Sequence, residues 1–504
     1  MDRGGRDSNT NAGTTDIPRS DVAHHREPMF RTRGDPRVTW LRRGSDPISS
    51  LLLASAIGIY ALVIVGATVS ITEASATCST WPTCNGQWLV PLNETGLLVA
   101  MGHRILALVV GGLVIATLLL TWIRGAPRRV RWAMLLVALL YPIQVGVGAM
   151  AALSGGAVPF PTLHLGMAMS IFVGVLVAFV WWLEETTDHV ESTFDDVEAA
   201  RSRDPPATEA TSPGSLGVAR AYLQLTKPRL MWLLCFVALA GMGLATATSG
   251  IPLTAAMVVG TMLGGVLAIG ASGTFNHILE RDVDEKMGRT SDRPTVTETV
   301  SIRGATTFGI LLAAASVAVF LILVNRLAAV LGLTAIVFYS IIYTVVLKPN
   351  TSQNIVIGGA VGALPGLIGW AAVTGSIGLP AIILGVLIFM WTPAHFYNLA
   401  LAYKQDYARG GFPMLPITHG EETTLRHIAW YFGATVLTAV VLGIVAPLGL
   451  LYAITVVAFA GIFLYTIVQL YRVRTPEVAF RTFHASNAFL GVVMLVLILD
   501  TIVL

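Results

Sequence analysis

Charge is scarce in this chain of 504 residues: only 12% of them are Asp, Glu, Lys or Arg, whereas 54% are hydrophobic. An average soluble domain is roughly 25% charged, so this sequence has about half of the usual solvating surface. The mean hydropathy is +0.71. The shortage of charge excludes a soluble multidomain enzyme and a fully disordered chain, and it leaves a polytopic helical membrane protein.

Cysteine is scarce as well, since Cys78, Cys84 and Cys235 are too few for a disulfide-rich secreted scaffold. The apolar runs are about 20 residues long, unlike the ~10-residue alternating segments of an outer-membrane barrel. The formal net charge of +3 is small and lies between the apolar runs, so no nucleic-acid partner is indicated. Residues 1–46 are polar and lack the apolar core of a signal peptide, which predicts a disordered tail.

What the chain has in abundance is apolar runs long enough to cross a bilayer, thirteen in all. Four runs precede and nine follow a segment, 186–219, that is rich in Asp, Glu, Ser, Thr and Pro and predicts a flexible linker. The predicted fold class is therefore an all-α polytopic membrane protein, with a four-helix module over 47–185 and a nine-helix domain over 220–504. The predicted spans are 51–71, 97–123, 132–152, 163–183, 230–248, 252–275, 305–324, 328–347, 354–374, 380–401, 428–446, 449–470 and 485–504.

Basic residues gather in alternate loops between these spans. If the N-terminus lies inside, the inner loops hold nearly all loop lysines and arginines, and the outer loops hold Arg326 alone. The positive-inside rule therefore predicts a cytoplasmic N-terminus in a protein of the plasma membrane.

The loop after the sixth span carries polar residues at a helical spacing. Asn276, Glu280 and Asp284 are four residues apart, so a continuing helix places them on one face. Oxygen ligands grouped in this way suit Mg²⁺, which leaves its other positions to water and substrate phosphate. Arg289 and Arg293 follow closely and can clamp a phosphate. The alternative is a solvated juxtamembrane turn with charges of both signs.

A second polar cluster lies on the same predicted side of the membrane. His395 stands near the inner end of its span, and Lys404 and Asp406 follow in the loop. Burying an ionisable group at such a depth is costly, so these groups are functional more often than not. The alternative for His395 is a hydrogen-bonded packing histidine beside the kink at Pro393.

Residues 220–504 contain four stretches in this order: LTKPRL (225–230), NHILERDVDEKMGRT (276–290), NIVIGGAVGALPGLIGWAAVTG (354–375) and WTPAHF…DYARGGFPMLP (391–416). In their order and spacing, these stretches resemble the UbiA superfamily of intramembrane prenyltransferases. Within it, the likeness is greatest to the haem-directed branch, the protohaem IX farnesyltransferases, or haem O synthases. In the second polar cluster the chain departs from the superfamily, which usually has a pair of aspartates there. Only Asp406 remains in this chain, with Lys404 nearby.

The resemblance implies a UbiA-like bundle that transfers farnesyl from farnesyl diphosphate to a vinyl group of haem b. Addition of water then gives haem O for terminal oxidase assembly. Mg²⁺ or Mn²⁺, held by Asn276, Glu280 and Asp284, would neutralise the diphosphate. The candidate catalytic residues are Asn276, Glu280, Asp284, Asp406 and Lys404, and the candidate substrate contacts are Lys227, Arg229, Arg289, Arg293, Lys348, Tyr343 and His395.

Two other interpretations stay open. The first is prenylation of a quinone precursor or another aromatic acceptor within the same fold. The second is a membrane protein that binds or transports haem without catalysis. The motifs of the haem-directed branch, at 276–290 and 391–416, argue against the first of these.

The first four spans carry two histidines at a similar predicted depth, His103 and His164, near the outer face. Two histidines that face each other in a four-helix bundle can bind one haem iron axially. The alternative is two interfacial histidines bonded to backbone or water. Cys78 and Cys84 share an outer loop on the oxidising side, where a disulfide can form. Two free or redox-active thiols are the other possibility.

This module resembles one half of haem A synthase, whose two four-helix halves each carry a histidine pair and a W-P-x-C-N-G-like loop. In that family the catalytic half has a glutamate three residues before the histidine of the H-R motif, and here Ala100 stands there. The resemblance therefore implies bound haem b, or its hand-over to the fused transferase, rather than oxidation of a haem methyl group. A haem A synthase or terminal oxidase assembly factors would be partners in that case.

Overall fold

The structure is a computed structural model that describes residues 46–71, 78, 80–91, 93–195, 214–446 and 448–503. The predicted tail lies outside these residues, apart from Asp46, and so does the stretch 196–213 of the predicted linker. In the described part of the chain, all the secondary-structure elements of more than two residues are helices. Thirteen of these helices are long and apolar enough to cross a membrane. The prediction of an all-α polytopic membrane protein is therefore confirmed.

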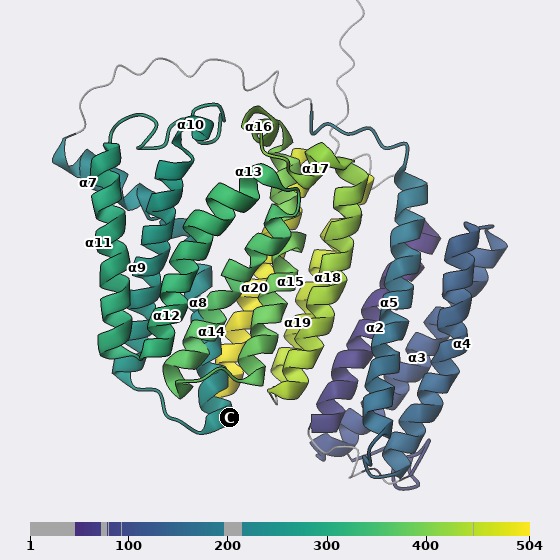
Figure 1. The fold of residues 1–504 in the computed structure, drawn as a ribbon. Helices are drawn as coiled ribbons and strands as arrows, with labels where there is room; N and C mark the ends of the chain where they lie inside the picture. The colour runs from purple at the N-terminus through teal and green to yellow at the C-terminus, as the bar shows by residue number, and fades with distance from the viewer. Residues whose placement is uncertain are drawn as a thin grey trace, which may run out of the picture. The chain divides into compact units, whose positions relative to one another are not determined.

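The first module consists of four long helices (Figure 1). The helix α4 packs along α5, and α2 packs against both α3 and α5. Glycine allows close approach here, since a Cβ on Gly58 of α2 would lie 3.1 Å from the side chain of Val110. The four helices are α2 Pro47–Ile71, α3 Thr95–Ile123, α4 Arg128–Leu153 and α5 Phe160–Thr187.

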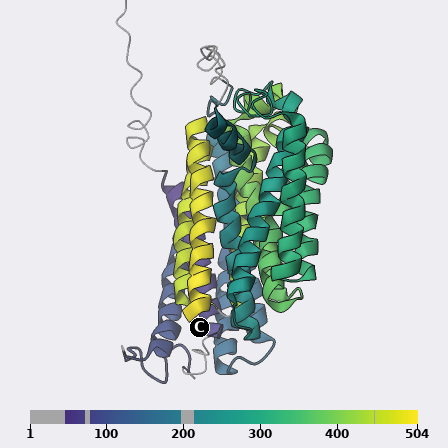
Figure 2. The same ribbon diagram turned by 90° about the vertical axis from the view of Figure 1, so that its left-hand side faces the viewer.

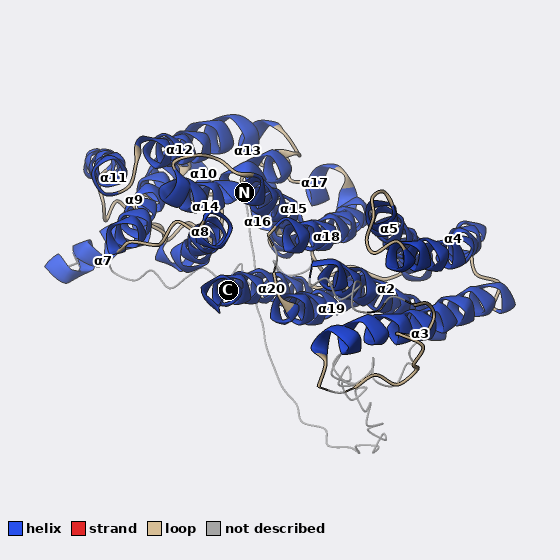
Figure 3. Cartoon of the chain, turned by 90° about the horizontal axis from the view of Figure 1, so that it is seen from below, coloured by secondary structure: helices blue, strands red, loops and turns tan. Residues whose placement is uncertain are grey.

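The second part is a larger bundle in which neighbours along the chain are not always neighbours in space. Seen along the helices, α14 lies beside α8, and α15 lies beside α18 (Figure 3). The last helix, α20, packs against α8, which is far from it in sequence (Figure 2). The long helices are α8 Pro228–Ser249, α9 Ala255–Leu279, α11 Ile302–Leu323, α12 Arg326–Val337 continued by η1 Phe338–Leu347, α14 Asn354–Thr374, α15 Leu379–Ala402, α18 Gly420–Val445, α19 Leu450–Arg472 and α20 Pro476–Val503.

Short helices gather at one end of this bundle, which the charge bias predicts to be the cytoplasmic end. Figure 1 shows α7, α10, α13, α16 and α17 at that end. They lie between the long helices along the chain and carry four of the candidate site residues, Asp284, Lys348, Lys404 and Asp406. Their bounds are α7 Ser215–Leu225, α10 Arg281–Asp284, α13 Lys348–Asn350, α16 Lys404–Arg409 and α17 Leu415–Thr418.

Several helices begin a few residues before their predicted apolar runs, and the difference is largest for α18 and α20. The helix α18 begins at Gly420 rather than 428, and α20 begins at Pro476 rather than 485. The added turns contain charged residues, including Glu421 and Arg481, which a hydropathy pattern excludes. The backbone of these turns nevertheless makes helical hydrogen bonds, because a helix can extend beyond the hydrocarbon core of the bilayer.

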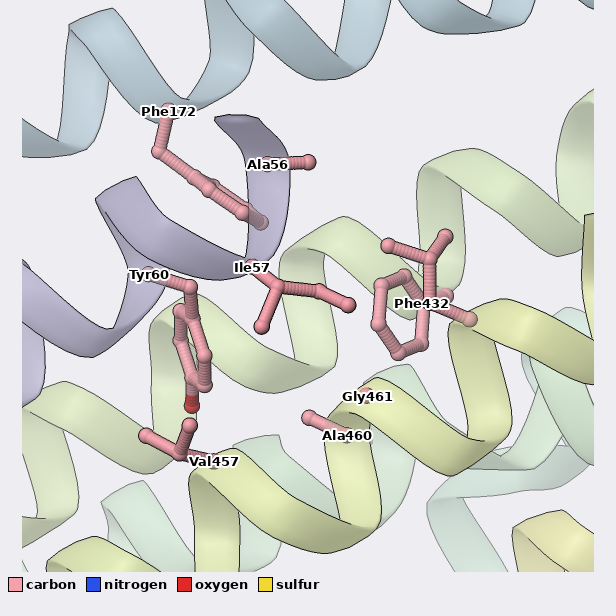
Figure 4. A pocket seen from close by; sticks show the side chains of 9 residues that line it. Ala56, Ile57, Tyr60, Phe172, Phe432, Val457, Ala460 and Gly461 are labelled. Atoms are coloured by element: carbon pink, nitrogen blue, oxygen red, sulfur yellow. The ribbon is translucent and has the colours of Figure 1, made fainter. Parts of the chain in front are cut away.

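The first module packs on the second part through α2 and α5, which contact α18 and α19. Aromatic and small side chains line a small apolar pocket there, among them Tyr60, Phe172 and Phe432 (Figure 4). The Tyr60 hydroxyl donates to the carbonyl of Val436 at 2.9 Å, so this buried polar group is satisfied across the contact. The predicted boundary between the two modules stays a prediction, because the helices on either side are packed together.

Candidate active site

The corner between α7 and α8 brings Lys227 to the end of α9. Lys227 adopts a left-handed backbone conformation (φ 54°) before Pro228 begins α8. Its ammonium donates to Oδ1 of Asn276 and, at 3.3 Å, to the hydroxyl of Tyr339. Gly273 permits this approach, because a Cβ there would lie only 2.8 Å from the carbonyl oxygen of Leu225.

Asn276, Glu280 and Asp284, which the sequence predicts to share one face after the sixth span, lie at this end of α9; we call them the acidic row. The helix ends at Leu279, and α10 continues the path after Glu280, whose carbonyl accepts from the amide of Asp284 at 2.8 Å. Asn276, Glu280 and Asp284 are nearly fully buried, with exposed fractions of 2%, 4% and 2%. The spacing of four residues thus brings the three side chains to one side of the chain, as the sequence predicts.

Each member of this row faces a basic side chain. Lys348 lies 2.6 Å from one carboxylate oxygen of Glu280, and Arg293 lies 3.7 Å from the other. Arg293 also forms an ion pair with Asp284. With Lys227 on Asn276, three basic groups converge on two carboxylates and one amide. The excess of basic groups suits a strongly anionic ligand such as a diphosphate.

This crowding shifts the pKa values of the row. Burial acts to raise the pKa of Glu280, but the charges of Lys348 and Lys227 outweigh it and hold the pKa below its usual value. Burial outweighs the nearby Arg293 at Asp284, so the pKa of that carboxyl is raised. Burial and the charge of Arg293 lower the pKa of Lys227 to about 7.

Asp406 of α16 organises the loop that follows the acidic row. Its two carboxylate oxygens accept from the backbone amides of Gly288, at 3.3 Å, and Arg289, at 3.2 Å. The same carboxylate forms an ion pair with Arg409. Both oxygens of Asp406 are thus engaged in holding the loop, which is a different task from binding substrate directly.

The guanidinium of Arg289 is held between two tyrosine rings. Its carbon lies 4.8 Å from the ring centre of Tyr403 and 5.5 Å from that of Tyr407. These cation–π contacts orient the group, and one Nη also donates to the hydroxyl of Tyr407 at 3.4 Å. Among the described residues, the buried Nε of Arg289 has no hydrogen-bond partner. The side chain is therefore oriented and still has a donor available for a phosphate oxygen.

Three residues predicted for the site lie apart from it. Lys404 forms ion pairs with Asp195 and Glu421, each at 2.9 Å. Arg229 is exposed on the first turn of α8. These positions give no support to a catalytic role for Lys404 or a phosphate contact from Arg229.

His395 is the third predicted site residue that lies apart from the site. It stacks between Trp391 and Phe483, each with a ring-centre distance of 4.2 Å, and its Nδ1 lies 2.7 Å from the hydroxyl of Ser486. This environment matches the alternative of a hydrogen-bonded packing histidine.

The π-helix η1 brings Tyr343 and a residue that the sequence did not suggest to the site. Tyr343 stacks on Tyr339 with a ring-centre distance of 5.6 Å. Thr344 lies next to them, and its hydroxyl oxygen is 3.1 Å from Nδ2 of Asn276. Nothing in the sequence points to Thr344, because a change of helical period leaves no trace in a run that is apolar on all sides.

His103 of α3 and His164 of α5 face each other in the first module, with ring centres 6.4 Å apart and planes at 75°. Nδ1 of His164 lies 3.1 Å from the carbonyl of Gln144. Small residues give both rings room, since a Cβ on Gly66 would lie 3.1 Å from His103 and one on Gly148 would lie 2.6 Å from His164.

The outer loop of this module is tied down beside His103. A disulfide joins Cys78 to Cys84, and their Cα atoms are 4.9 Å apart. The guanidinium of Arg104 donates to the carbonyls of Thr80, at 2.9 Å, and Thr83, at 2.7 Å. Of the two possibilities that the sequence leaves open, the structure has the disulfide.

A bundle of membrane-crossing helices with a buried acidic row and a ring of cations at one end is the architecture of an intramembrane prenyltransferase. Residues 233–493 match the model of the UbiA prenyltransferase family. A relative from Halobacterium salinarum, named protoheme IX farnesyltransferase, is 52% identical over 464 residues, which are 92% of this chain and 99% of the relative. The chain belongs to the UbiA prenyltransferase family and is a prenyltransferase enzyme of the membrane.

A shorter relative bears the same name. The protoheme IX farnesyltransferase of Pseudarthrobacter chlorophenolicus is 40% identical over 302 residues, which are 59% of this chain and 94% of that protein. A solved structure of a UbiA homolog from Archaeoglobus fulgidus bound to DMAPP and Mg²⁺ is 19% identical. Its TM-score is 0.42, and the alignment covers 55% of this chain and 98% of that one.

Proposed function

We propose that this enzyme transfers the farnesyl group of farnesyl diphosphate to a vinyl group of protohaem IX, giving haem O. In this reaction the bond between the farnesyl C1 and the diphosphate oxygen breaks, and the vinyl carbon bonds to C1. The resulting cation takes hydroxide from water, and the remaining proton is released. The main support for this proposal is the buried row of Asn276, Glu280 and Asp284, whose side chains contact basic residues. The relatives of this chain that are named protoheme IX farnesyltransferase support it as well.

The oxygen donors of the row fit a divalent cation of the Mg²⁺ type. The described residues include no cluster of three or more His, Cys, Asp or Glu that could hold a metal by itself. Two carboxylates and one amide oxygen are instead a partial ligand set, as Mg²⁺ prefers when a phosphate supplies the remaining ligands. Bound there, Mg²⁺ or Mn²⁺ would stabilise the negative charge that develops on the leaving diphosphate.

The basic residues would bind the diphosphate around this row. Lys348 and Arg293 already lie against the carboxylates, and Arg289 offers a free donor. These charges are fixed before the substrate arrives, so they stabilise the leaving group without reorganisation. The ring of Tyr339 lies next to Lys227 and stacks on Tyr343, and these two rings would face the allylic cation.

The test compares two acidic residues of the same loop that differ in burial. In purified enzyme supplied with farnesyl diphosphate and protohaem IX, Glu280→Gln should lower kcat/KM at least about 100-fold, as loss of a preorganised electrostatic group does. Asp282→Asn, at an exposed position two residues away, should keep the activity. The product is identified by the mass of the extracted haem.

Two outcomes would contradict the proposal. A prenylated quinone precursor, formed without any haem O, would favour the other acceptor. Haem that binds to the protein and is recovered unchanged with farnesyl diphosphate present would favour a haem-binding protein without catalysis.

A second function is favoured by a separate observation in the first module. Two imidazoles that bind one iron through nitrogens about 2 Å from the metal have ring centres roughly 6 Å apart. The rings of His103 and His164 have this separation, at 6.4 Å. We propose that the module binds haem b between them, as a store or a route of hand-over to the transferase, with a haem A synthase or oxidase assembly factors as partners.

Absorbance of the purified protein tests this second proposal. His103→Ala and His164→Ala should each reduce the Soret band, whereas His189→Ala, an exposed histidine beyond α5, should not. Unchanged spectra in both variants would rule out the histidine pair as haem ligands.

The proposed location is the plasma membrane, with the N-terminus and the acidic row on the cytoplasmic side. The basic loops support this orientation. The disulfide between Cys78 and Cys84 supports the same orientation, because disulfides persist in oxidising compartments.

A further inference from the structure

The carboxamide of Asn276 is held between two groups with opposite hydrogen-bonding requirements. Its Nδ2 lies 3.1 Å from the hydroxyl oxygen of Thr344, and its Oδ1 accepts from the ammonium of Lys227. Asn276 is 2% exposed and Thr344 is 5% exposed. Water has little access to either contact, so these two neighbours decide which way the amide points.

The hydroxyl of Thr344 has already committed its hydrogen. It donates to the carbonyl of Tyr339, five residues earlier, at 2.8 Å. In an α-helix a threonine hydroxyl reaches the carbonyl three or four residues back. The π-helical turns of η1 bring the carbonyl of residue i−5 within reach instead.

A hydroxyl that has donated its single hydrogen can only accept from another partner. Thr344 therefore requires the NH₂ end of the Asn276 amide. The ammonium of Lys227 has only donors, so it requires the oxygen end. Both neighbours select the same orientation, with Nδ2 directed toward Thr344 and Oδ1 directed toward Lys227.

We propose that Thr344 is a positioning residue that keeps the amide oxygen of Asn276 directed to the site of the divalent cation. With the amide reversed, an NH₂ group would face the cation, and a metal ligand would be replaced by a repulsive donor. The inference rests on the proposed function, because it assumes that Asn276 binds the cation. It adds the reason why an amide, which has only one metal-binding end, can serve at this position.

The experiment measures binding of Mn²⁺, with inorganic diphosphate present, to the purified full-length protein by electron paramagnetic resonance. Thr344→Val should weaken Mn²⁺ binding about tenfold or more, as loss of a group that orients a metal ligand does. Thr344→Ser retains the hydroxyl and should bind like the wild type. Thr334→Val, on the exposed side of α12, is the control for the loss of a threonine hydroxyl from the same span.

A double-mutant cycle separates orientation from general disturbance of the site. Asp at position 276 has two equivalent oxygens, so its ability to bind Mn²⁺ should not depend on the hydroxyl at 344. We expect Thr344→Val to weaken binding in the wild-type background and to have no such effect in the Asn276→Asp background.

Two results would overturn the inference, and they are distinguishable. If the wild type binds Mn²⁺ and Thr344→Val binds it equally well, the positioning role is wrong and the proposed metal site stands. If the wild type shows no saturable Mn²⁺ binding, the proposed metal site fails, and the inference fails with it.

Discussion

Lys348 and Glu280 form a buried ion pair whose removal can be predicted in some detail. The ammonium is 2.6 Å from the carboxylate, and the two side chains are only 11% and 5% exposed. Replacing Lys348 by Met keeps an unbranched side chain of similar length but removes the charge. The change therefore leaves a carboxylate in surroundings that exclude most of the water.

Breaking a buried ion pair from one side costs about 3–5 kcal/mol, mainly because the remaining charge is unpaired. Here Arg293 remains 3.7 Å from the second oxygen of Glu280 and offsets part of that cost. We therefore expect Lys348→Met to reduce the free energy of unfolding at pH 7 by about 2–3 kcal/mol.

The pH dependence has a definite sign. In the wild type the lowered pKa of Glu280 contributes stability that is present above the pKa of the unfolded chain and is lost as the pH falls through the folded-state pKa. Without Lys348, burial acts to raise that pKa, and the variant gains stability when the carboxyl takes up a proton. The difference between the two proteins should shrink as the pH falls toward the pKa of a free glutamate.

The assay is denaturant unfolding in mixed micelles, followed by helical circular dichroism at several pH values. Glu280→Gln and the double variant Glu280→Gln, Lys348→Met complete a double-mutant cycle, with an expected coupling of about 2 kcal/mol. A variant within about 0.5 kcal/mol of the wild type at pH 7, or strictly additive substitutions, would refute the argument.

Two further predictions concern geometry. Asp406→Asn should raise the KM for farnesyl diphosphate about tenfold, with a smaller change in kcat. The reason is that the substitution weakens the charge-assisted hydrogen bond to the backbone amide of Arg289. An unchanged KM would contradict the argument that Asp406 positions the loop of Arg289. Gly273→Ala should cost about 1–3 kcal/mol of stability and most of the activity, since the added methyl meets the carbonyl of Leu225. Gly265→Ala, which faces open space on the same helix, should be neutral in thermal unfolding and turnover, and equal effects at both positions would contradict the crowding argument.

The membrane class, the thirteen spans and the acidic row could all be predicted from local features of the sequence. The preference of an apolar run for lipid is a local property, so hydropathy locates the spans without knowledge of their neighbours. The spacing of Asn276, Glu280 and Asp284 is local too, because four residues make about one helical turn. The starts of α18 and α20 could not be predicted in this way, because their first turns are polar and lie outside the apolar runs.

The partner that each charged group meets depends on the packing of the helices and could not be predicted. Lys348 reaches Glu280 across 68 residues, and Lys404 turns away from the row to Asp195, 209 residues before it. Such pairs depend on how helices distant in sequence pack, and no local spacing encodes that. Thr344 is the clearest case, because its contact with Asn276 requires a π-helix that the surrounding apolar sequence does not reveal.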